Sequence, residues 1–251
     1  MSQSYVNIDS GLANRIRLVM TDVDGTITDF HGRIEGVAAD AIRSLSANGV
    51  IVGFVSGRTL PRLDVPARES GIDGPIIGEN GGIAKLNSTG ELLDLGYSRH
   101  PALRDLDRLK ALYPGAIEST EDDADRLVDV GFKASGVDTA DLRKHLRESE
   151  LLDSGYMLHL MQKGVSKGGT LMKILNRIGD GDLSPEEVVV VGDSPTDMSL
   201  FDLFPHSVLV LNSRVSEAGR REVESIVEFA SELEFGAGFA QVAAHILGLR
   251  R

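Results

Sequence analysis

Short, almost wholly apolar runs alternate along the chain with longer segments in which apolar residues recur every three or four positions. The apolar runs predict buried β-strands at residues 16–20, 49–55, 75–78, 187–191 and 207–211. The periodic segments predict helices at residues 34–48, 60–71, 166–178 and 237–247. Strands that are apolar on both faces, with helices between them, are typical of a covered parallel sheet. We therefore predict the α/β fold class, with a doubly wound, Rossmann-like core domain.

The middle of the chain has a different pattern. Residues 126–134 and 156–161 alternate apolar and polar positions, as half-exposed strands do. Helical periodicity at 101–113 and 139–148 predicts two helices beside them. The turn-forming run at 87–90 predicts a hairpin where this region begins. An antiparallel sheet with helices on one face is the simplest arrangement of such elements, so we predict a small α+β module inserted into the core.

This interpretation divides the chain into a discontinuous catalytic core, residues 1–84 and 160–251, and an α+β cap, residues 85–159. The first dozen residues carry weak signals, and we expect them to be loosely ordered.

Composition narrows the possible chemistry. The 251 residues include no cysteine, which excludes disulfides, thiolate metal sites and cysteine nucleophiles. Any metal must be held by oxygen or imidazole, and with only 6 His we expect oxygen. The net charge of −12 disfavours nucleic acid and anionic membranes as partners. We see neither a signal peptide nor a run that could span a bilayer, so we expect a cytoplasmic protein.

Acidic residues follow two of the predicted strands. Asp22 and Asp24 come directly after the strand at 16–20, and they point the same way if the strand geometry continues. Asp193 and Asp197 follow the strand at 187–191 in the same manner. Turn formation and helix capping would explain either pair alone. Because both pairs follow strand ends, where α/β sheets bind ligands, we predict one four-carboxylate site for a hard cation such as Mg²⁺.

Two further segments suit an anion. Ser56 and Gly57 end the strand at 49–55, where a hydroxyl and loop N–H groups can hold phosphate oxygens. Lys167 begins the helix at 166–178, and a helix N-terminus attracts anions. A polar turn and a solvated lysine are the alternatives.

Taken together, the four segments resemble the motifs of the haloacid dehalogenase-like phosphohydrolases, in the same order along the chain. Asp22-Val23-Asp24-Gly25-Thr26 matches the first motif, Ser56 the second, Lys167 the third, and the loop from Gly192 to Asp197 the fourth. The inserted module resembles the family's α+β cap of the second type. Segments 74–82 and 154–161 look like the archaeal phosphoglycolate phosphatase branch, which is related to sucrose-phosphate phosphatases. The fourth motif departs from that branch in having Thr196 where Asn is usual.

The resemblance implies a Mg²⁺-dependent phosphatase in which Asp22 is the nucleophile and Asp24 the general acid and base. It also implies that Asp22, the backbone carbonyl of Asp24, Asp193 and Asp197 hold the metal. Further, it implies that the phosphorylated substrate is bound by Ser56, Gly57, Lys167 and Asn80.

The resemblance implies 2-phosphoglycolate as the small phosphorylated substrate. Cap residues Arg126, Lys133 and His159 are candidates for meeting its carboxylate. A sugar-phosphate phosphatase of the sucrose-phosphate or mannosyl-3-phosphoglycerate type, a phosphomannomutase-like phosphotransferase and a phosphate-binding regulator without turnover are the alternatives. We expect a monomer or a homodimer.

Overall fold

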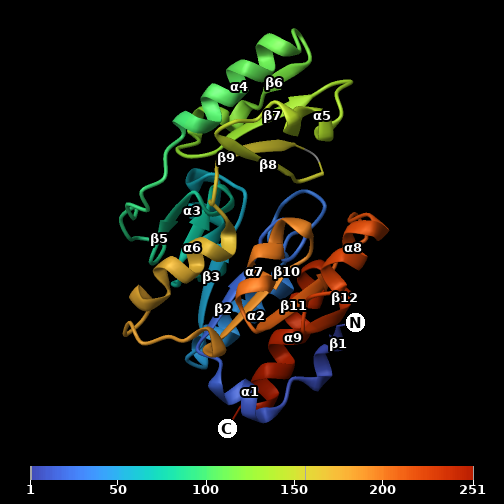
Figure 1. Cartoon of the computed structure of the whole chain (residues 1–251). Helices are drawn as coiled ribbons and strands as arrows, with labels where there is room; N and C mark the ends of the chain where they lie inside the picture. The colour runs from blue at the N-terminus through green and yellow to red at the C-terminus, as the bar shows by residue number, and fades with distance from the viewer. Residues whose placement is uncertain (1, 156, 251) are drawn as a thin grey trace.

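A computed structural model describes residues 2–155 and 157–250 of the chain (Figure 1). The larger of its two sheets has the strand order β1-β12-β11-β10-β2-β3-β4-β5. All neighbours in it are parallel except β5, which runs antiparallel to β4. This confirms the predicted α/β class with a parallel sheet at its core. The strands of this sheet are β1 (Gln3–Ser4), β2 (Leu18–Thr21), β3 (Ile51–Val55), β4 (Ile76–Gly78), β5 (Ile83–Lys85), β10 (Val188–Gly192), β11 (His206–Leu211) and β12 (Phe229–Glu234).

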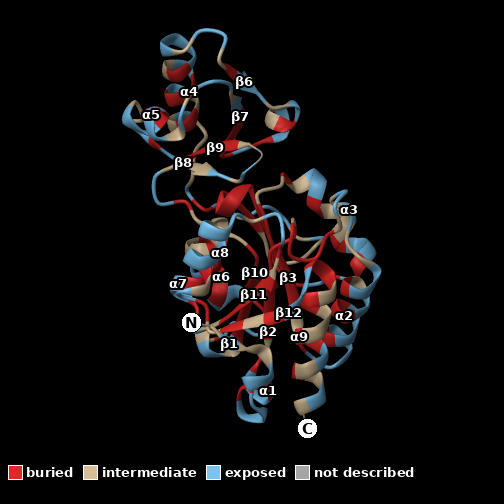
Figure 2. Ribbon diagram, turned by 90° about the vertical axis from the view of Figure 1, so that its right-hand side faces the viewer, coloured by how far each residue is buried: buried red, intermediate tan, exposed pale blue. Residues whose placement is uncertain are grey.

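Helices cover both faces of the large sheet because its central strands are apolar on both sides. In β10, Val189 and Val191 face one apolar cluster, while Val188 and Val190 face the other. Figure 2 shows the buried strands between helices whose outer sides are exposed. The first cluster is completed by α1 (Ser10–Arg15), α2 (Gly36–Ala47), α3 (Leu60–Ser70) and α9 (Phe235–Leu249). The second is completed by α6 (Lys167–Ile174), α7 (Met198–Leu203) and α8 (Glu217–Glu224).

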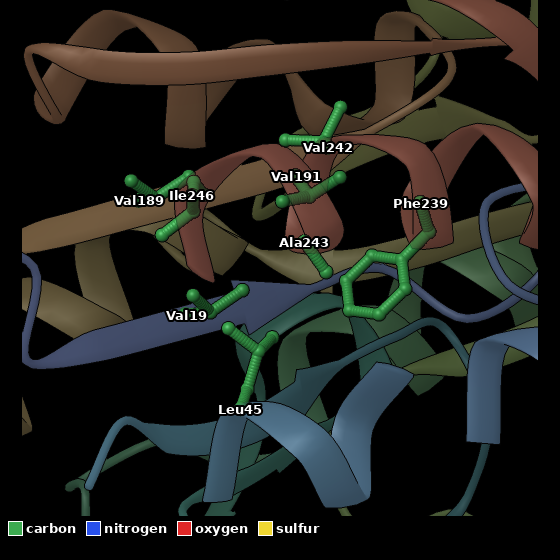
Figure 3. A pocket seen from close by; sticks show the side chains of 8 residues that line it. All are labelled: Val19, Leu45, Val189, Val191, Phe239, Val242, Ala243 and Ile246. Carbon is green, nitrogen blue, oxygen red and sulfur yellow. The ribbon is translucent and has the colours of Figure 1, made fainter. Parts of the chain in front are cut away.

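A small void lies inside the first cluster, between strands β2 and β10 and helices α2 and α9 (Figure 3). Its volume is about 10 Å³, and its walls are apolar side chains such as Val19, Leu45 and Phe239. That is about the space one water molecule needs, and such a water would have no polar partner here. The void is therefore an imperfection in core packing and not a ligand site.

The smaller sheet is antiparallel and has the order β6-β7-β9-β8. Its apolar face packs against α4 and α5 and forms a third core. Figure 1 places this sheet at one end of the molecule, joined to the rest by two chain segments. The predicted α+β module is confirmed in this architecture. Its elements are α4 (His100–Leu112), β6 (Ile117–Ser119), β7 (Val130–Ala134), α5 (Thr139–Lys144), β8 (Ser149–Asp153) and β9 (Leu158–Gln162).

Strand pairing places the module differently from the expected boundaries at 84/85 and 159/160. Both positions fall inside strands, because β5 pairs with β4 in the large sheet and β9 continues to Gln162 in the small one. The expected hairpin at 87–90 is only a turn: the Leu93 N–H reaches the Ala84 carbonyl, but no strand follows in the described structure. Tyr156, where we predicted the last strand of the module to begin, lies outside the described residues.

The expectation of a loosely ordered N-terminus is wrong for the described residues. Strand β1 pairs with β12 at the sheet edge, and Ile8 and Leu12 are buried against α9. A two-residue strand has too little pattern to be seen in the sequence, and its partner β12 was not predicted either. Among the described residues, no helix combines the length and apolarity needed to cross a membrane.

One buried carboxylate organises the small module. Asp105 on α4 is inaccessible to solvent and accepts hydrogen bonds from the backbone N–H groups of Arg147, Glu148 and Ser149, at 2.8–3.0 Å. The hydroxyl of Ser149 donates to the same oxygen at 2.8 Å. These bonds fix the start of β8 against the helix.

Replacing this carboxylate should destabilise the protein, because three backbone N–H groups and the buried hydroxyl of Ser149 would lose their acceptor. We expect Asp105→Ala to lower the free energy of unfolding by about 2–4 kcal/mol. The matched control is Asp107→Ala, an exposed position on the same helix, which should change it by less than about 0.5 kcal/mol. Urea unfolding followed by circular dichroism measures both. Equal losses in the two variants would contradict the proposed role of Asp105.

Candidate active site

The two acidic loops meet because their strands are neighbours in the sheet. Strand β2 pairs in parallel with β10, so that Thr21 lies beside Val191 and both strands end at the same edge. The backbone N–H of Asp22 continues the ladder by donating to the Val191 carbonyl at 2.8 Å. Carboxyl ends of adjacent parallel strands are where α/β folds place ligands. Asp22 and Asp193 therefore start their loops side by side.

Lys167 lies at the centre of this cluster. Its Nζ donates to Asp22 Oδ1 and to Asp197 Oδ1, both at 2.6 Å. Asp22, Asp193 and Asp197 each offer a carboxylate oxygen within 4.8 Å of the others, and all three are buried. Ser166 caps the helix that starts at Lys167 by accepting the Gly169 N–H. The chain thus brings one ammonium and three carboxylates from three distant segments into one buried site.

The surrounding hydrogen bonds hold Asp193 on both sides. Thr26 Oγ1 donates to Asp193 Oδ1 at 2.7 Å, and Asn212 Nδ2 donates to Oδ2 at 2.6 Å. Gly25 has a φ of +86°, and a Cβ there would lie 2.4 Å from Asn212 Nδ2, so only glycine fits. Sequence reasoning missed Asn212. Its position directly after the apolar strand at 207–211 is the same signal that identified the two acidic pairs.

Asp197 has a structural role as well as its contact with Lys167. Its Oδ2 accepts the backbone N–H groups of Asp193 and Ser194, at 3.1 and 3.3 Å, and so closes the loop that follows β10. Helix capping, the alternative explanation for this motif, is therefore present together with the ionic contact. Thr196 points its hydroxyl to Ser194 Oγ at 2.9 Å.

The cluster holds more negative charge than its ammonium can balance. Burial, followed by the charge of Asp197, raises the pKa of Asp193 to about 7. Burial likewise raises the pKa of Asp22 well above its usual range, although Lys167 opposes the shift. Burial alone would lower the pKa of Lys167, but the carboxylates of Asp197 and Asp22 outweigh it and raise that pKa. Three buried carboxylates of this kind fit a hard divalent cation, whose preferred ligands are oxygens.

Asp24 does not join the cluster, and the expectation of a four-carboxylate site is wrong in this respect. Strand β2 ends at Thr21 and the chain then turns, so the extended geometry that would align Asp22 with Asp24 does not continue. Arg58 instead binds both oxygens of Asp24, with Nε–Oδ2 at 2.8 Å and Nη2–Oδ1 at 2.5 Å. Arg58 also donates to the Gly32 carbonyl at 2.8 Å.

Ser56, Gly57 and Asn80 lie together beside the joint between core and small module. Ser56 is buried at the end of β3, and a Cβ on Gly57 would lie 2.9 Å from Asn80 Oδ1. Asn80 has a φ of +56° and contacts the module through Nδ2 and Asp129 Oδ2, at 3.3 Å. Its neighbour Glu79 accepts backbone N–H groups of residues 127–129 at 2.7–3.0 Å. Burial raises the pKa of Glu79.

A cavity of about 220 Å³ opens between the large sheet and the small one. Core residues on its wall include Ser166, Lys167, Thr196 and Ser199, and Asn80 lies at the joint. The module contributes residues of β8 and β9. This cavity therefore reaches from Lys167 to the underside of the small sheet.

The three cationic candidates of the module do not line this cavity. Arg126 is buried in ion pairs with Asp122 and Asp129, at 2.8 and 2.6 Å. His159 Nδ1 lies 2.9 Å from Asp129 Oδ2. Lys133 is exposed on β7, away from the cavity wall. In this arrangement Arg126 and His159 build the joint between the sheets.

Comparison with known proteins agrees with the geometry. The sequence profile of haloacid dehalogenase-like hydrolases matches residues 19–97 and 114–217. A phosphoglycolate phosphatase of Methanoculleus marisnigri is 34% identical over 237 residues, covering 90% of this chain and 94% of that protein.

Solved structures give the same result. A protein of Thermoplasma acidophilum has a TM-score of 0.79 at 28% identity, covering 92% of this chain and 98% of that one. The sucrose-phosphatase of Synechocystis, solved with sucrose and phosphate, shares the fold with a TM-score of 0.71 at 15% identity, covering 93% and 98%. The chain therefore belongs to the haloacid dehalogenase-like hydrolases, with a cap module, and is a phosphoric monoester hydrolase.

Proposed function

We propose that the protein is a Mg²⁺-dependent phosphatase that cleaves a small phosphate monoester, 2-phosphoglycolate first among them, through an aspartyl-phosphate. The observation that carries this proposal is the buried Lys167 held between Asp22 and Asp197 at the carboxyl ends of β2 and β10. The substrate is suggested by the name of the 34%-identical relative. The small module would act as the cap over the reacting groups.

Asp22 is the proposed nucleophile. One of its carboxylate oxygens forms a bond to phosphorus while the bond to the leaving oxygen breaks, which divides one difficult displacement into two easier ones. Asp24 gives its proton to the leaving oxygen, and then takes a proton from the water that attacks the aspartyl-phosphate and frees Asp22. Since Arg58 binds both oxygens of Asp24 in this structure, that contact must open for the proton transfer.

The metal-binding groups in this proposal are the carboxylates of Asp22, Asp193 and Asp197 and the backbone carbonyl of Asp24. When bound, Mg²⁺ would offset the repulsion between the attacking carboxylate and the phosphoryl oxygens. Lys167 adds a fixed positive charge at the same place, and Ser56, the Gly57 N–H and Asn80 would donate to the remaining oxygens. These donors are set in place before the reaction, so they stabilise developing charge without reorganising.

The hydroxyls of Ser166 and Ser199 line the cavity beside Lys167 and would donate to the nearby carboxylate of 2-phosphoglycolate. A sugar-phosphate phosphatase is the second candidate, because the cavity extends well beyond this short leaving group to β8 and β9.

The nucleophile can be tested directly. We expect Asp22→Asn to lower kcat for p-nitrophenyl phosphate by at least about 10⁴-fold, because the attacking oxygen is lost. Circular dichroism should show an unchanged fold. Asp202→Asn, at an exposed position on α7, is the matched control and should keep wild-type activity. An Asp22→Asn variant that turned over at the wild-type rate would refute the assignment.

Metal binding should depend on pH, because a proton on Asp193 competes with the cation. With the pKa of Asp193 raised to about 7 by burial and by Asp197, its ionised form is lost as the pH falls below that value. Mg²⁺ affinity should therefore fall by up to about tenfold per pH unit below 7 and level off above it. Isothermal titration calorimetry measures the affinity, and EDTA should abolish activity. Constant affinity between about pH 6 and 8, or full activity in EDTA, would contradict the metal proposal.

A hydrolase and a mutase differ in what they release. We expect one inorganic phosphate per ester consumed, with no requirement for a bisphosphate activator, since the proposed second step uses water. A phosphate-release assay beside quantification of the remaining ester checks this. Isomerised ester without free phosphate would identify a phosphotransferase instead.

A further inference from the structure

The loop that follows β3 has three successive carbonyls, and one of them is bound by the small module. The backbone N–H groups of residues 79–80 donate to the carbonyls of Arg58 and Ser56, at 2.9 and 3.0 Å, so these two bonds stay within the core. The Gly57 carbonyl between them accepts from Arg126 Nη1 of the module at 3.2 Å. One peptide of the proposed phosphate-binding loop therefore depends on a residue of the cap.

The residue type at position 57 makes this bond necessary. Asn80 packs so closely on Gly57 that a Cβ there would lie 2.9 Å from Asn80 Oδ1, which favours glycine. Glycine restricts its own backbone dihedral angles less than any other residue, so the peptide that follows it can turn over. The hydrogen bond from Arg126 to the carbonyl opposes that turn.

The direction of the peptide between Gly57 and Arg58 decides what the Ser56 hydroxyl can do. While Arg126 binds the carbonyl, the N–H of the same planar peptide points the opposite way and donates to Ser56 Oγ at 3.2 Å. A hydroxyl that accepts an N–H keeps its own proton for another acceptor. If the peptide turned over, the carbonyl would face Ser56 Oγ and accept that proton.

Arg126 is itself held in one orientation. Its side chain is buried, and its two terminal nitrogens donate to Asp122 at 2.8 Å and to Asp129 at 2.6 Å. Its Nε–H has no acceptor among the described residues. A buried ion pair adds little net stability compared with apolar packing, and an unpaired buried donor reduces stability. These features favour a guanidinium whose role is to direct a hydrogen bond.

We propose that Arg126 is a positioning residue for phosphoryl binding: by holding the Gly57 carbonyl, it leaves the Ser56 hydroxyl free to donate to a phosphoryl oxygen. The cap thus contributes to phosphate binding through the core loop, without touching the substrate. This role rests on the proposed phosphatase activity, in which Ser56 is one of the phosphoryl donors.

The experiment measures the dissociation constant of inorganic phosphate by isothermal titration calorimetry with Mg²⁺ present, and kcat/KM for p-nitrophenyl phosphate. Arg126→Lys keeps the positive charge, but its single nitrogen does not reproduce the fork that reaches two carboxylates and the Gly57 carbonyl. Ser56→Ala removes the hydroxyl through which Arg126 is proposed to act. The double variant shows whether the two residues act through the same hydrogen bond.

Arg99→Lys is the matched control, because it makes the same substitution in the same joint. Arg99 donates to the Asp129 carbonyl at 3.1 Å and to Asp123 at 2.6 Å, and its hydrogen bonds among the described residues stay within the module. Thermal melts verify that each variant is folded. If Arg126→Lys does not fold, Arg126→Gln combined with Asp122→Asn removes the guanidinium together with one carboxylate charge and serves in its place.

We expect Arg126→Lys to weaken phosphate binding and to lower kcat/KM by roughly five- to tenfold, the effect of losing one hydrogen bond to a charged group. Ser56→Ala should cause a similar loss, and the double variant should lose no more than about twofold beyond Ser56→Ala alone. Arg99→Lys should stay within about twofold of the wild type.

Three results would overturn the role of Arg126 while leaving the phosphatase proposal intact. They are an unchanged phosphate affinity in Arg126→Lys, an equal loss in Arg99→Lys, which would mark a general loosening of the joint, and a loss from Arg126→Lys that persists in full in the Ser56→Ala background. A wild type that frees no phosphate from p-nitrophenyl phosphate would instead overturn both proposals.

Discussion

The ammonium of Lys167, buried between Asp22 and Asp197, is the contact on which the site depends. It joins the loop after β2, the loop after β10 and the first turn of α6, which are far apart in the sequence. Without it, three carboxylates would face one another in a buried space, at a large cost in desolvation and repulsion. One ammonium cannot balance three carboxylates. The negative charge left over, together with burial, raises the pKa values of Asp22 and Asp193. The fold thus retains an unbalanced negative charge among buried carboxylates. Binding of a divalent cation there would reduce the repulsion between them.

Much of this arrangement could be predicted from the sequence because the central strands are apolar on both faces and acidic residues follow them directly. The same reasoning failed where the structure depends on contacts that the local sequence pattern does not reveal. The orientation of Asp24 was misjudged, since the strand geometry stops at Thr21 and Arg58, more than thirty residues away, provides its partner. Strand β1 has only two residues and depends on its pairing with β12, while β12 is held mainly by its pairing with β11, so the sequence pattern of neither segment predicts a strand. Residue types and strand ends therefore locate the cluster, whereas the direction of each side chain depends on contacts from distant segments.

The joint between the two sheets explains why Arg126 and His159 do not line the cavity. Glu79 accepts N–H groups from residues 127–129, while Asp129 binds both Arg126 and His159. A buried charge is stable only when it is paired, so Arg126 is held by Asp122 and Asp129. Its Nη1 also donates to the Gly57 carbonyl of the core at 3.2 Å. Non-glycine residues with positive φ at Glu79 and Asn80 are uncommon, and the hydrogen bonds across the joint hold them there. The joint thus brings Asn80 to the cavity and withdraws Arg126 from it.

The net charge of the protein and the charges at the site act on the substrate over different distances. A protein with a net charge of −12 repels anions at long range, yet its proposed substrate is a phosphate ester. This long-range repulsion is screened within about 10 Å at moderate ionic strength, so what the phosphoryl group meets at contact decides binding. At the core end it meets Lys167, uncharged donors and a site suited to a divalent cation. At the far end the cavity wall carries Glu150, which is exposed to solvent. The charges that the phosphoryl group meets at contact therefore differ in sign from the net charge, so the acidity of the surface does not decide whether the phosphoryl group binds.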